Sequence, residues 1–173
     1  MRKYFKVITI IIAVIFLSGC NNIKLEKYTG ENLNVGVIGE IPEIREDNVI
    51  FNKITFKDLE EKNTLSKYDA IFITKDNLIE ASEGKYSSIY KEGIVPFFFI
   101  ESTKGDIPFI YEELSYEEVP QQGNPPFYAV GIYIKDSKLS SIEYGLYNDI
   151  KNKKNIEDVY SRIFKTISEN KIY

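Results

Sequence analysis

Two glutamates that directly follow predicted strands are the first candidates for chemistry in this chain of 173 residues. Glu40 follows a β-rich run at residues 33–38, and Glu101 follows a more apolar run at residues 95–100. A pair of carboxyl groups held around a substrate is able to do acid–base work. Strand ends are exposed and polar in any α/β protein, so the same two glutamates also suit a protein without catalysis.

Lysines and tyrosines near the same strand ends are candidates for ligand binding. Lys75 follows a predicted strand at residues 68–74, and Lys104 lies just beyond the strand at residues 95–100. Ligands of open α/β sheets bind outside the carboxyl ends of the parallel strands, where these side chains are expected. Residues 101–126 are rich in proline and glycine, which predicts a long loop with one or two helical turns at residues 108–114. We expect its Tyr111 and Tyr116 to supply contact area to one wall of the site.

The residue types that are missing exclude many kinds of site. The sequence has no histidine, which rules out a Ser-His-Asp triad and a histidine-based metal site. Its one cysteine, Cys20, lies in the N-terminal region and leaves the rest of the chain without a thiol. We therefore expect no metal and no cofactor, and we favour binding over enzymatic activity.

The first twenty residues have the layout of a secretory signal peptide. Basic residues precede an unbroken apolar run at residues 7–17, which is shorter than the roughly 20 residues that span a bilayer. The run ends in Leu17-Ser18-Gly19-Cys20, which resembles the lipobox of bacterial lipoproteins. This resemblance implies cleavage before Cys20 and a diacylglyceryl group on its sulfur, and two acyl chains give stable anchoring. We expect a lipid-anchored protein at the extracytoplasmic face of the cell membrane.

The charge balance bears on the choice of partners. The formal net charge is -4, and the basic signal segment leaves the remainder more acidic still. Nucleic acids select basic patches, so we expect no nucleic-acid partner. The expected partners are the membrane, through the lipid on Cys20, and an unidentified extracytoplasmic protein, peptide or glycan.

The pattern of apolar residues predicts one α/β domain. Strands are expected at residues 33–38, 49–56, 68–74 and 95–100, and the last two are apolar enough to be buried on both faces of a parallel sheet. A helix is expected from residue 76 or 77 towards residue 90, with Gly93 just past its end. Residues 127–134 and 138–147 form a predicted hairpin, and an apolar stripe predicts a final helix from a cap at Asn155 to about residue 170.

These elements predict a layered α/β sandwich. It has a mainly parallel central sheet, an antiparallel C-terminal hairpin at one edge and a C-terminal amphipathic helix. We assign residues 1–19 to a lipoprotein signal peptide, residues 20–32 to the lipidated cysteine and a flexible tether, and residues 33–173 to the single α/β domain.

Short segments of the body resemble a known group of bacterial proteins. The segments VGVIGE, YDAIFIT, FFFIES, YGLYND and DVYSRIF are similar to a family of small uncharacterised lipoproteins from low-GC Gram-positive bacteria. No activity is assigned to that family, so the resemblance implies location only. The strand pattern also resembles flavodoxin-like and amidotransferase-like sheets, but the catalytic cysteine and histidine of the amidotransferases are absent here.

Two functional hypotheses follow from the sequence. The first is a non-catalytic, membrane-tethered binding or interaction domain, which the missing residue types favour. The second is a carboxylate-dependent hydrolase that uses Glu40 and Glu101 on cell-wall glycans. That chemistry needs carboxyl groups about 5 Å apart in a retaining enzyme or roughly 6.5–9.5 Å apart in an inverting one.

Overall fold

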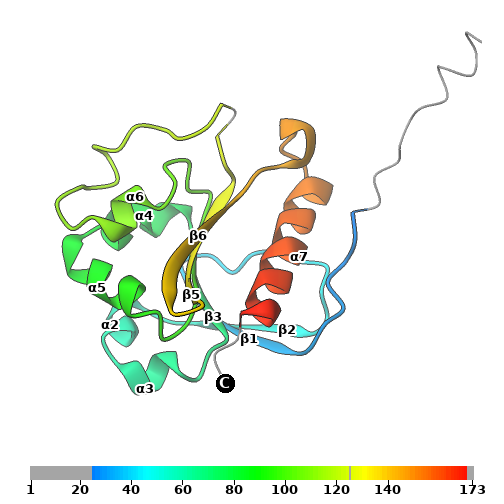
Figure 1. Ribbon diagram of the computed structural model, residues 1–173. Helices are drawn as coiled ribbons and strands as arrows, with labels where there is room; N and C mark the ends of the chain where they lie inside the picture. Colours follow the sequence, from blue (N-terminus) through cyan, green and yellow to red (C-terminus); the bar gives the residue numbers. More distant parts are fainter. Residues whose placement is uncertain (1–24, 125, 171–173) are drawn as a thin grey trace, which may run out of the picture.

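A mixed sheet forms the centre of the computed structural model, which describes residues 25–124 and 126–170. Within these residues the sheet has six strands in the order β2-β1-β3-β4-β5-β6 (Figure 1). Strands β2, β1, β3 and β4 run parallel to one another, and β5 and β6 are added antiparallel. The predicted α/β fold with a C-terminal hairpin at one edge is thereby confirmed. The strands are β1 (Leu33–Ile38), β2 (Val49–Lys53), β3 (Ala70–Ile73), β4 (Phe97–Ile100), β5 (Ala129–Lys135) and β6 (Lys138–Tyr144).

The central strands are apolar throughout because both faces of the sheet are covered. Side chains alternate between the faces along a strand. Phe97 and Phe99 of β4 therefore lie in the core on one face, and Phe98 and Ile100 lie in the core on the other.

One long helix covers one face, and several short helices cover the opposite face (Figure 1). The long helix is α7 (Lys153–Glu169), and the stripe predicted from the sequence packs on the sheet. The ring of Phe164 stacks on that of Phe72 with 6.2 Å between centroids. The short elements are α2 (Phe56–Leu59), α3 (Lys62–Leu65), η1 (Lys75–Asn77), α4 (Leu78–Ala81), α5 (Gly84–Glu92) and α6 (Ile107–Ile110), and η2 (Tyr147–Asp149) precedes α7.

The helix expected up to residue 90 is divided into η1, α4 and α5. Gly84 begins α5 against the backbone of Glu112, where a Cβ atom would lie 2.6 Å from the Glu112 carbonyl oxygen. The division brings α5 next to residues 101–126. Gly93 ends α5 in the left-handed conformation with φ 64°, as the sequence predicts.

The start of α7 differs from the expected cap. Asn152, rather than Asn155, is the N-cap, and its side chain accepts a hydrogen bond of 2.9 Å from the backbone N–H of Asn155. The Asn155 amide donates instead to the carbonyl oxygens of Tyr147 and Ile150. Asn155 thus ties the connection from β6 to the first turn of α7.

Part of residues 101–126, expected to be a loop, belongs to the core. Phe109 of α6 is buried and lies flat on Phe99, with 3.6 Å between the ring centroids. The Ser87 hydroxyl of α5 donates to the Ile110 carbonyl oxygen at 2.7 Å. Residues 107–110 therefore complete the apolar layer over β4.

Residues 25–32, expected as the second part of a flexible tether, contact the domain. The Arg45 guanidinium donates to the carbonyl oxygens of Leu25 and Glu26 at 3.3 and 2.7 Å, and to the Ser161 hydroxyl of α7. Tyr28 is buried beside Phe164, with 6.0 Å between ring centroids.

Cys20 and the predicted signal peptide lie outside the described residues. Within residues 25–124 and 126–170, the structure has no helix with both the length and the apolar character of a membrane span.

Candidate functional site

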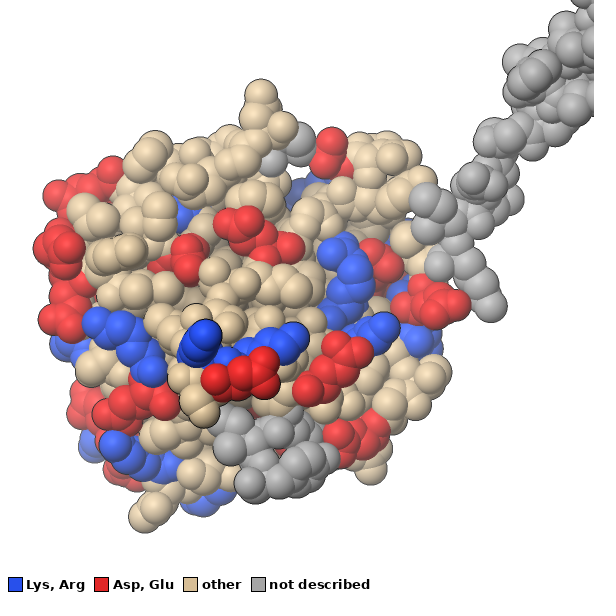
Figure 2. Space-filling model, in the orientation of Figure 1, with Lys and Arg blue, Asp and Glu red and all other residues tan. Residues whose placement is uncertain are grey.

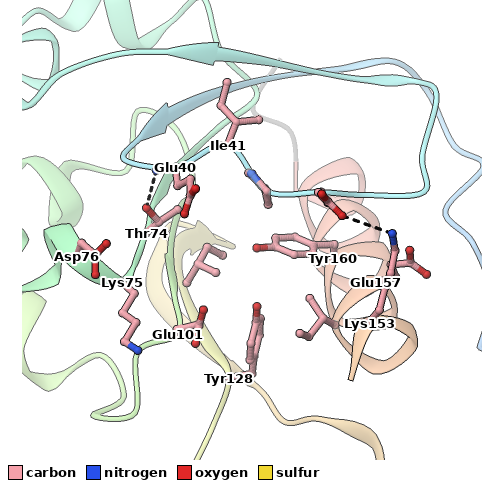
Figure 3. A pocket seen from close by; sticks show the side chains of 14 residues that line it. Glu40, Ile41, Thr74, Lys75, Asp76, Glu101, Tyr128, Lys153, Glu157 and Tyr160 are labelled. Carbon is pink, nitrogen blue, oxygen red and sulfur yellow. Dashed lines mark hydrogen bonds and ion pairs between the residues drawn. The ribbon is translucent and has the colours of Figure 1, made fainter. Parts of the chain in front are cut away.

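A cavity of about 590 Å³ lies at the carboxyl edge of the parallel strands, between these strand ends and the first half of α7. In Figure 3, Lys75 and Asp76 lie on one side of this cavity, and Lys153 and Glu157 of α7 lie on the other. We call it the main cavity. It is lined by Glu40, Ile41, Pro42, Glu43, Thr74, Lys75, Asp76, Ile100, Glu101, Tyr128, Lys153, Ile156, Glu157 and Tyr160.

A tight contact after β1 and β3 forms one wall. The backbone N–H of Glu40 donates to the Thr74 hydroxyl at 3.0 Å, and that hydroxyl also lies 3.3 Å from the Ile38 carbonyl oxygen (Figure 3). Gly39 makes this approach possible, since its φ is 103° and a side chain there would collide with Thr74 and Asn77. The glycine is therefore required where the strand ends.

Glu101 follows β4 in an unusual backbone conformation. Its φ is 60°, in the left-handed region that residues with a Cβ atom rarely occupy. A carboxylate oxygen of Glu101 lies 2.5 Å from the ammonium group of Lys151, which belongs to the connection between β6 and α7. Strained backbone persists only where the surrounding structure holds it, and such positions cluster at functional sites.

Two buried tyrosines form the floor of the main cavity beside Glu101. Figure 3 shows the hydroxyl groups of Tyr128 and Tyr160 pointing into the space between the strand ends and α7. Burial raises the pKa of the Tyr128 hydroxyl to about 12, and the charge of Glu101 adds to the rise. Burial also raises the pKa of Tyr160 far above its usual value. Both phenols are thus neutral at physiological pH, and each is able to donate and accept a hydrogen bond.

Carboxylates outnumber ammonium groups around the main cavity. Lys153 pairs with Glu43 at 3.4 Å, and Glu101 pairs with Lys151. The carboxylates of Glu40, Asp76 and Glu157 make no ion pair or hydrogen bond to other described residues. The lining therefore carries a net negative charge that the described residues only partly neutralise.

A second, smaller cavity of about 220 Å³ meets the main cavity at Glu101 and Tyr128. It is more apolar on one side, where Pro126, Phe127 and Leu146 line it. Lys151 also lines the smaller cavity, so its side chain lies beside the boundary between the two spaces.

The structure brings some of the predicted site residues together and separates others. Glu40, Lys75 and Glu101 line the main cavity. Lys104 instead donates to the Tyr116 carbonyl oxygen at 2.5 Å, with its ammonium group 4.7 Å from the centre of the Tyr116 ring.

Among residues 101–124 and 126, which the structure describes, Glu101 alone lines the main cavity, and Thr103 and Pro126 join it at the smaller one. Tyr111 is 51% exposed and lines neither of these cavities. The tyrosines of this segment therefore supply no wall to the main cavity. Its apolar side chains turn towards the core over β4 instead, as Phe109 does.

Residues of the second half of the chain were missed as site residues. Tyr160 falls on the apolar stripe of α7, and Tyr128 lies at the start of the strand predicted at residues 127–134, so both fitted a structural role equally well. Each does pack in the core with its ring, while its hydroxyl faces the main cavity. The polar face of α7 supplies Lys153 and Glu157, whose position depends on how the helix crosses the sheet.

Other kinds of site find little support among the described residues. No group of three or more His, Cys, Asp or Glu residues among them is arranged to hold a metal ion. Acidic and basic side chains are interspersed over the face shown in Figure 2. That face therefore does not present the continuous basic surface that nucleic acids select.

The sheet order and the main cavity together define an α/β domain with a site at the carboxyl edge of its parallel strands. Comparison with family models, curated proteins and solved structures finds no match.

Proposed function

We propose that this protein is a membrane-tethered, extracytoplasmic binding protein that takes a small polar ligand, or the end of a larger one, into the main cavity. The observation that carries the proposal is the cavity itself, which lies where open α/β sheets bind their ligands. Its volume falls within the range of about 300–1,000 Å³ that is typical of ligand pockets. The lipobox at residues 17–20 supports the location of the domain at the membrane.

The lining suits binding of a polar ligand. The hydroxyl groups of Tyr128 and Tyr160 are neutral and point into the cavity, so they are able to orient a ligand by hydrogen bonds. Their rings are held in the core by α7 and the sheet, which keeps the hydroxyls in place. A polar group that is fixed before the ligand arrives reduces the entropy lost on binding.

A panel of probes in calorimetry and thermal melts tests this proposal. The full-length protein is kept in a nonionic polyoxyethylene detergent, and the probes are butylammonium, inorganic phosphate, N-acetylglucosamine oligomers and short lysine-containing peptides. A probe that binds the folded state raises the melting midpoint as its concentration increases. Because one hydrogen bond contributes about 1 kcal/mol, Tyr160→Phe should weaken the binding of such a probe by about fivefold.

A matched control is Tyr133→Phe, which removes a hydroxyl of β5 that lies outside the main cavity lining. It should leave the binding unchanged. Absence of binding by every probe, or equal losses in Tyr160→Phe and Tyr133→Phe, would contradict a ligand site in the main cavity.

A carboxylate-dependent hydrolase of cell-wall glycans is the second candidate. One observation favours it: Glu40 and Glu101 line the same cavity. Release of reducing ends from purified cell-wall glycan, lost in both Glu40→Gln and Glu101→Gln, would establish this candidate in place of the first.

A further inference from the structure

The ammonium group of Lys151 occupies a cation-binding arrangement in the smaller cavity, beside Glu101 and Tyr128, which also line the main cavity. It lies 2.5 Å from a carboxylate oxygen of Glu101 and 5.9 Å from the centre of the Tyr128 ring. A carboxylate beside an aromatic face is the combination that binds organic ammonium ions, through an ion pair and a cation–π contact. The protein's own lysine thus shows that this place accepts an alkylammonium group.

Lys151 is held at this place by few contacts. Its side chain is 58% exposed, whereas that of Glu101 is 30% exposed. Partly exposed ion pairs of this kind are weak, because water screens the charges and both side chains lose freedom. The connection that carries Lys151 also contains two consecutive residues with left-handed backbone, Asn148 and Asp149, with φ of 49° and 59°. A competing ammonium ion is therefore able to displace Lys151 at small cost.

The charges around the main cavity favour such a competitor. Glu40, Asp76 and Glu157 present carboxylates that no described residue neutralises. An entering cation gains from these charges as well as from Glu101, whereas an anion meets repulsion from all of them. Lys75, on the opposite side of the cavity from α7, is a separate positive group that suits an acceptor on the same ligand (Figure 3).

From these contacts we infer that the main cavity recognises a ligand with a primary ammonium group, and that this group replaces Lys151 on Glu101. The inference rests on the proposed binding function and names its ligand class. Lys151 acts as a built-in occupant that fills the ammonium position in the absence of ligand. The affinity measured for a cation is therefore lowered by the fraction of molecules in which Lys151 occupies Glu101.

Calorimetry with butylammonium on the full-length protein tests the inference. Butyrate and 1-butanol share the apolar chain without the positive charge, and they should not bind at the same concentrations. In Glu101→Gln the shape is kept while the charge is lost, so butylammonium should bind about tenfold more weakly or worse.

The decisive variant is Lys151→Met, which keeps the length of the side chain and removes the competing ammonium group. Because an exposed ion pair is weak, butylammonium should bind about two- to fivefold more tightly to this variant. Lys154→Met is the matched control, since Lys154 is exposed on α7 and outside the cavity linings. It removes the same charge and should give no comparable gain. The gain should also vanish when Lys151→Met is combined with Glu101→Gln.

Each of the following outcomes bears on the ammonium ligand or on the proposed function. Equal affinities in Lys151→Met and Lys154→Met, or undiminished binding to Glu101→Gln, would overturn the inference. A glycan or phosphate that binds in a Tyr160-dependent manner, while butylammonium does not bind, would overturn the ammonium class and leave the proposed function standing. If no probe of the panel binds, both fail together. Circular dichroism of each variant shows whether it is folded, and the Lys151 variant alters only an exposed connection.

Discussion

The left-handed backbone of Glu101 makes an inverted order of stabilities expected for two substitutions at this position. Glycine is normally more destabilising than alanine, because it loses more backbone freedom on folding. At a φ of 60°, however, a Cβ atom is unfavourable and glycine is not. Glu101→Gly should therefore be more stable than Glu101→Ala, although both remove the same carboxylate and the same ion pair with Lys151.

The magnitude follows from two opposing contributions. A residue with a Cβ atom is less stable by about 1–2 kcal/mol in the left-handed region. Glycine loses about 0.5–1 kcal/mol more backbone conformational entropy on folding than alanine does. The difference leaves Glu101→Gly more stable by about 0.5–1 kcal/mol. The loss of the ion pair cancels, because it is common to the two variants.

Urea unfolding of the full-length protein, followed by circular dichroism, measures this difference as a shift of the midpoint at constant slope. For a chain of this length, 1 kcal/mol corresponds to about 2–4 °C in a thermal melt. Lys165→Gly and Lys165→Ala provide the control on α7, where the backbone is helical and the side chain is exposed. There glycine should be the less stable variant by about 1 kcal/mol.

If Glu101→Ala is at least as stable as Glu101→Gly, the reasoning about strain is refuted. That result would mean that the ion pair with Lys151, rather than the fold of β4 and its following turn, imposes the conformation of Glu101. If Glu101→Gly is the more stable variant, the backbone at Glu101 is strained. The site then keeps a residue that lowers the stability of the fold, as is common where function competes with stability.

The remaining predictions concern the core, the anchor and pH. Phe164→Ala should lower the free energy of unfolding by about 3–5 kcal/mol, because the ring is fully buried; a loss under about 0.5 kcal/mol in urea unfolding would show that α7 does not pack on the sheet. Phe109→Ala should cost a similar amount, since Phe109 stacks on a core ring of β4; a loss typical of a surface residue would instead return it to a mobile loop. Cys20→Ser should abolish labelling with radioactive fatty acid and release the protein from the membrane fraction or leave an unprocessed precursor; unchanged processing and membrane binding would refute the lipobox. The melting midpoint should fall at alkaline pH, and a midpoint that stays constant from neutral pH to about pH 12 would contradict the burial of Tyr128 and Tyr160. The folded state favours the protonated phenols, so their contribution is complete below about pH 10 and is lost as the pH rises through the Tyr128 pKa of about 12; Tyr128→Phe should remove part of this loss.

The sequence predicts the sheet well because the strands carry their own signals. β3 and β4 are short and apolar throughout, which is the pattern of strands buried on both faces. The hairpin turn at residues 135–138 is likewise local, since Asp136 and Ser137 adopt the positive φ values that a two-residue turn needs. The rule that ligands bind at the carboxyl ends of parallel strands then places Glu40, Lys75 and Glu101 at one edge, and they do line one cavity.

The remaining residues of the site are placed by tertiary packing, so their roles could not be predicted from the sequence. Whether the hydroxyl of Tyr160 faces solvent, core or cavity is decided by where α7 crosses the sheet, and an apolar stripe does not specify that. The interruption before Gly84 arises from the close approach of the Glu112 backbone, a contact between residues far apart in the chain. The role of Lys151 likewise appears only when the connection after β6 meets the end of β4.

If the protein is lipid-anchored as proposed, the contact between Arg45 and the N-terminal segment limits how the domain moves at the membrane. The loop from β1 to β2 lines the main cavity at Glu40 and Glu43, and a few residues later its Arg45 holds the carbonyl groups of Leu25 and Glu26. If Cys20 is lipidated as proposed, the link from the lipid to Leu25 spans five residue steps, or roughly 17 Å at full extension. The domain is then confined to a layer next to the bilayer and has little freedom to rotate away from it. Its cavity searches in two dimensions, so it meets compounds that are themselves held or enriched at the membrane surface far more often than those free in the surrounding medium.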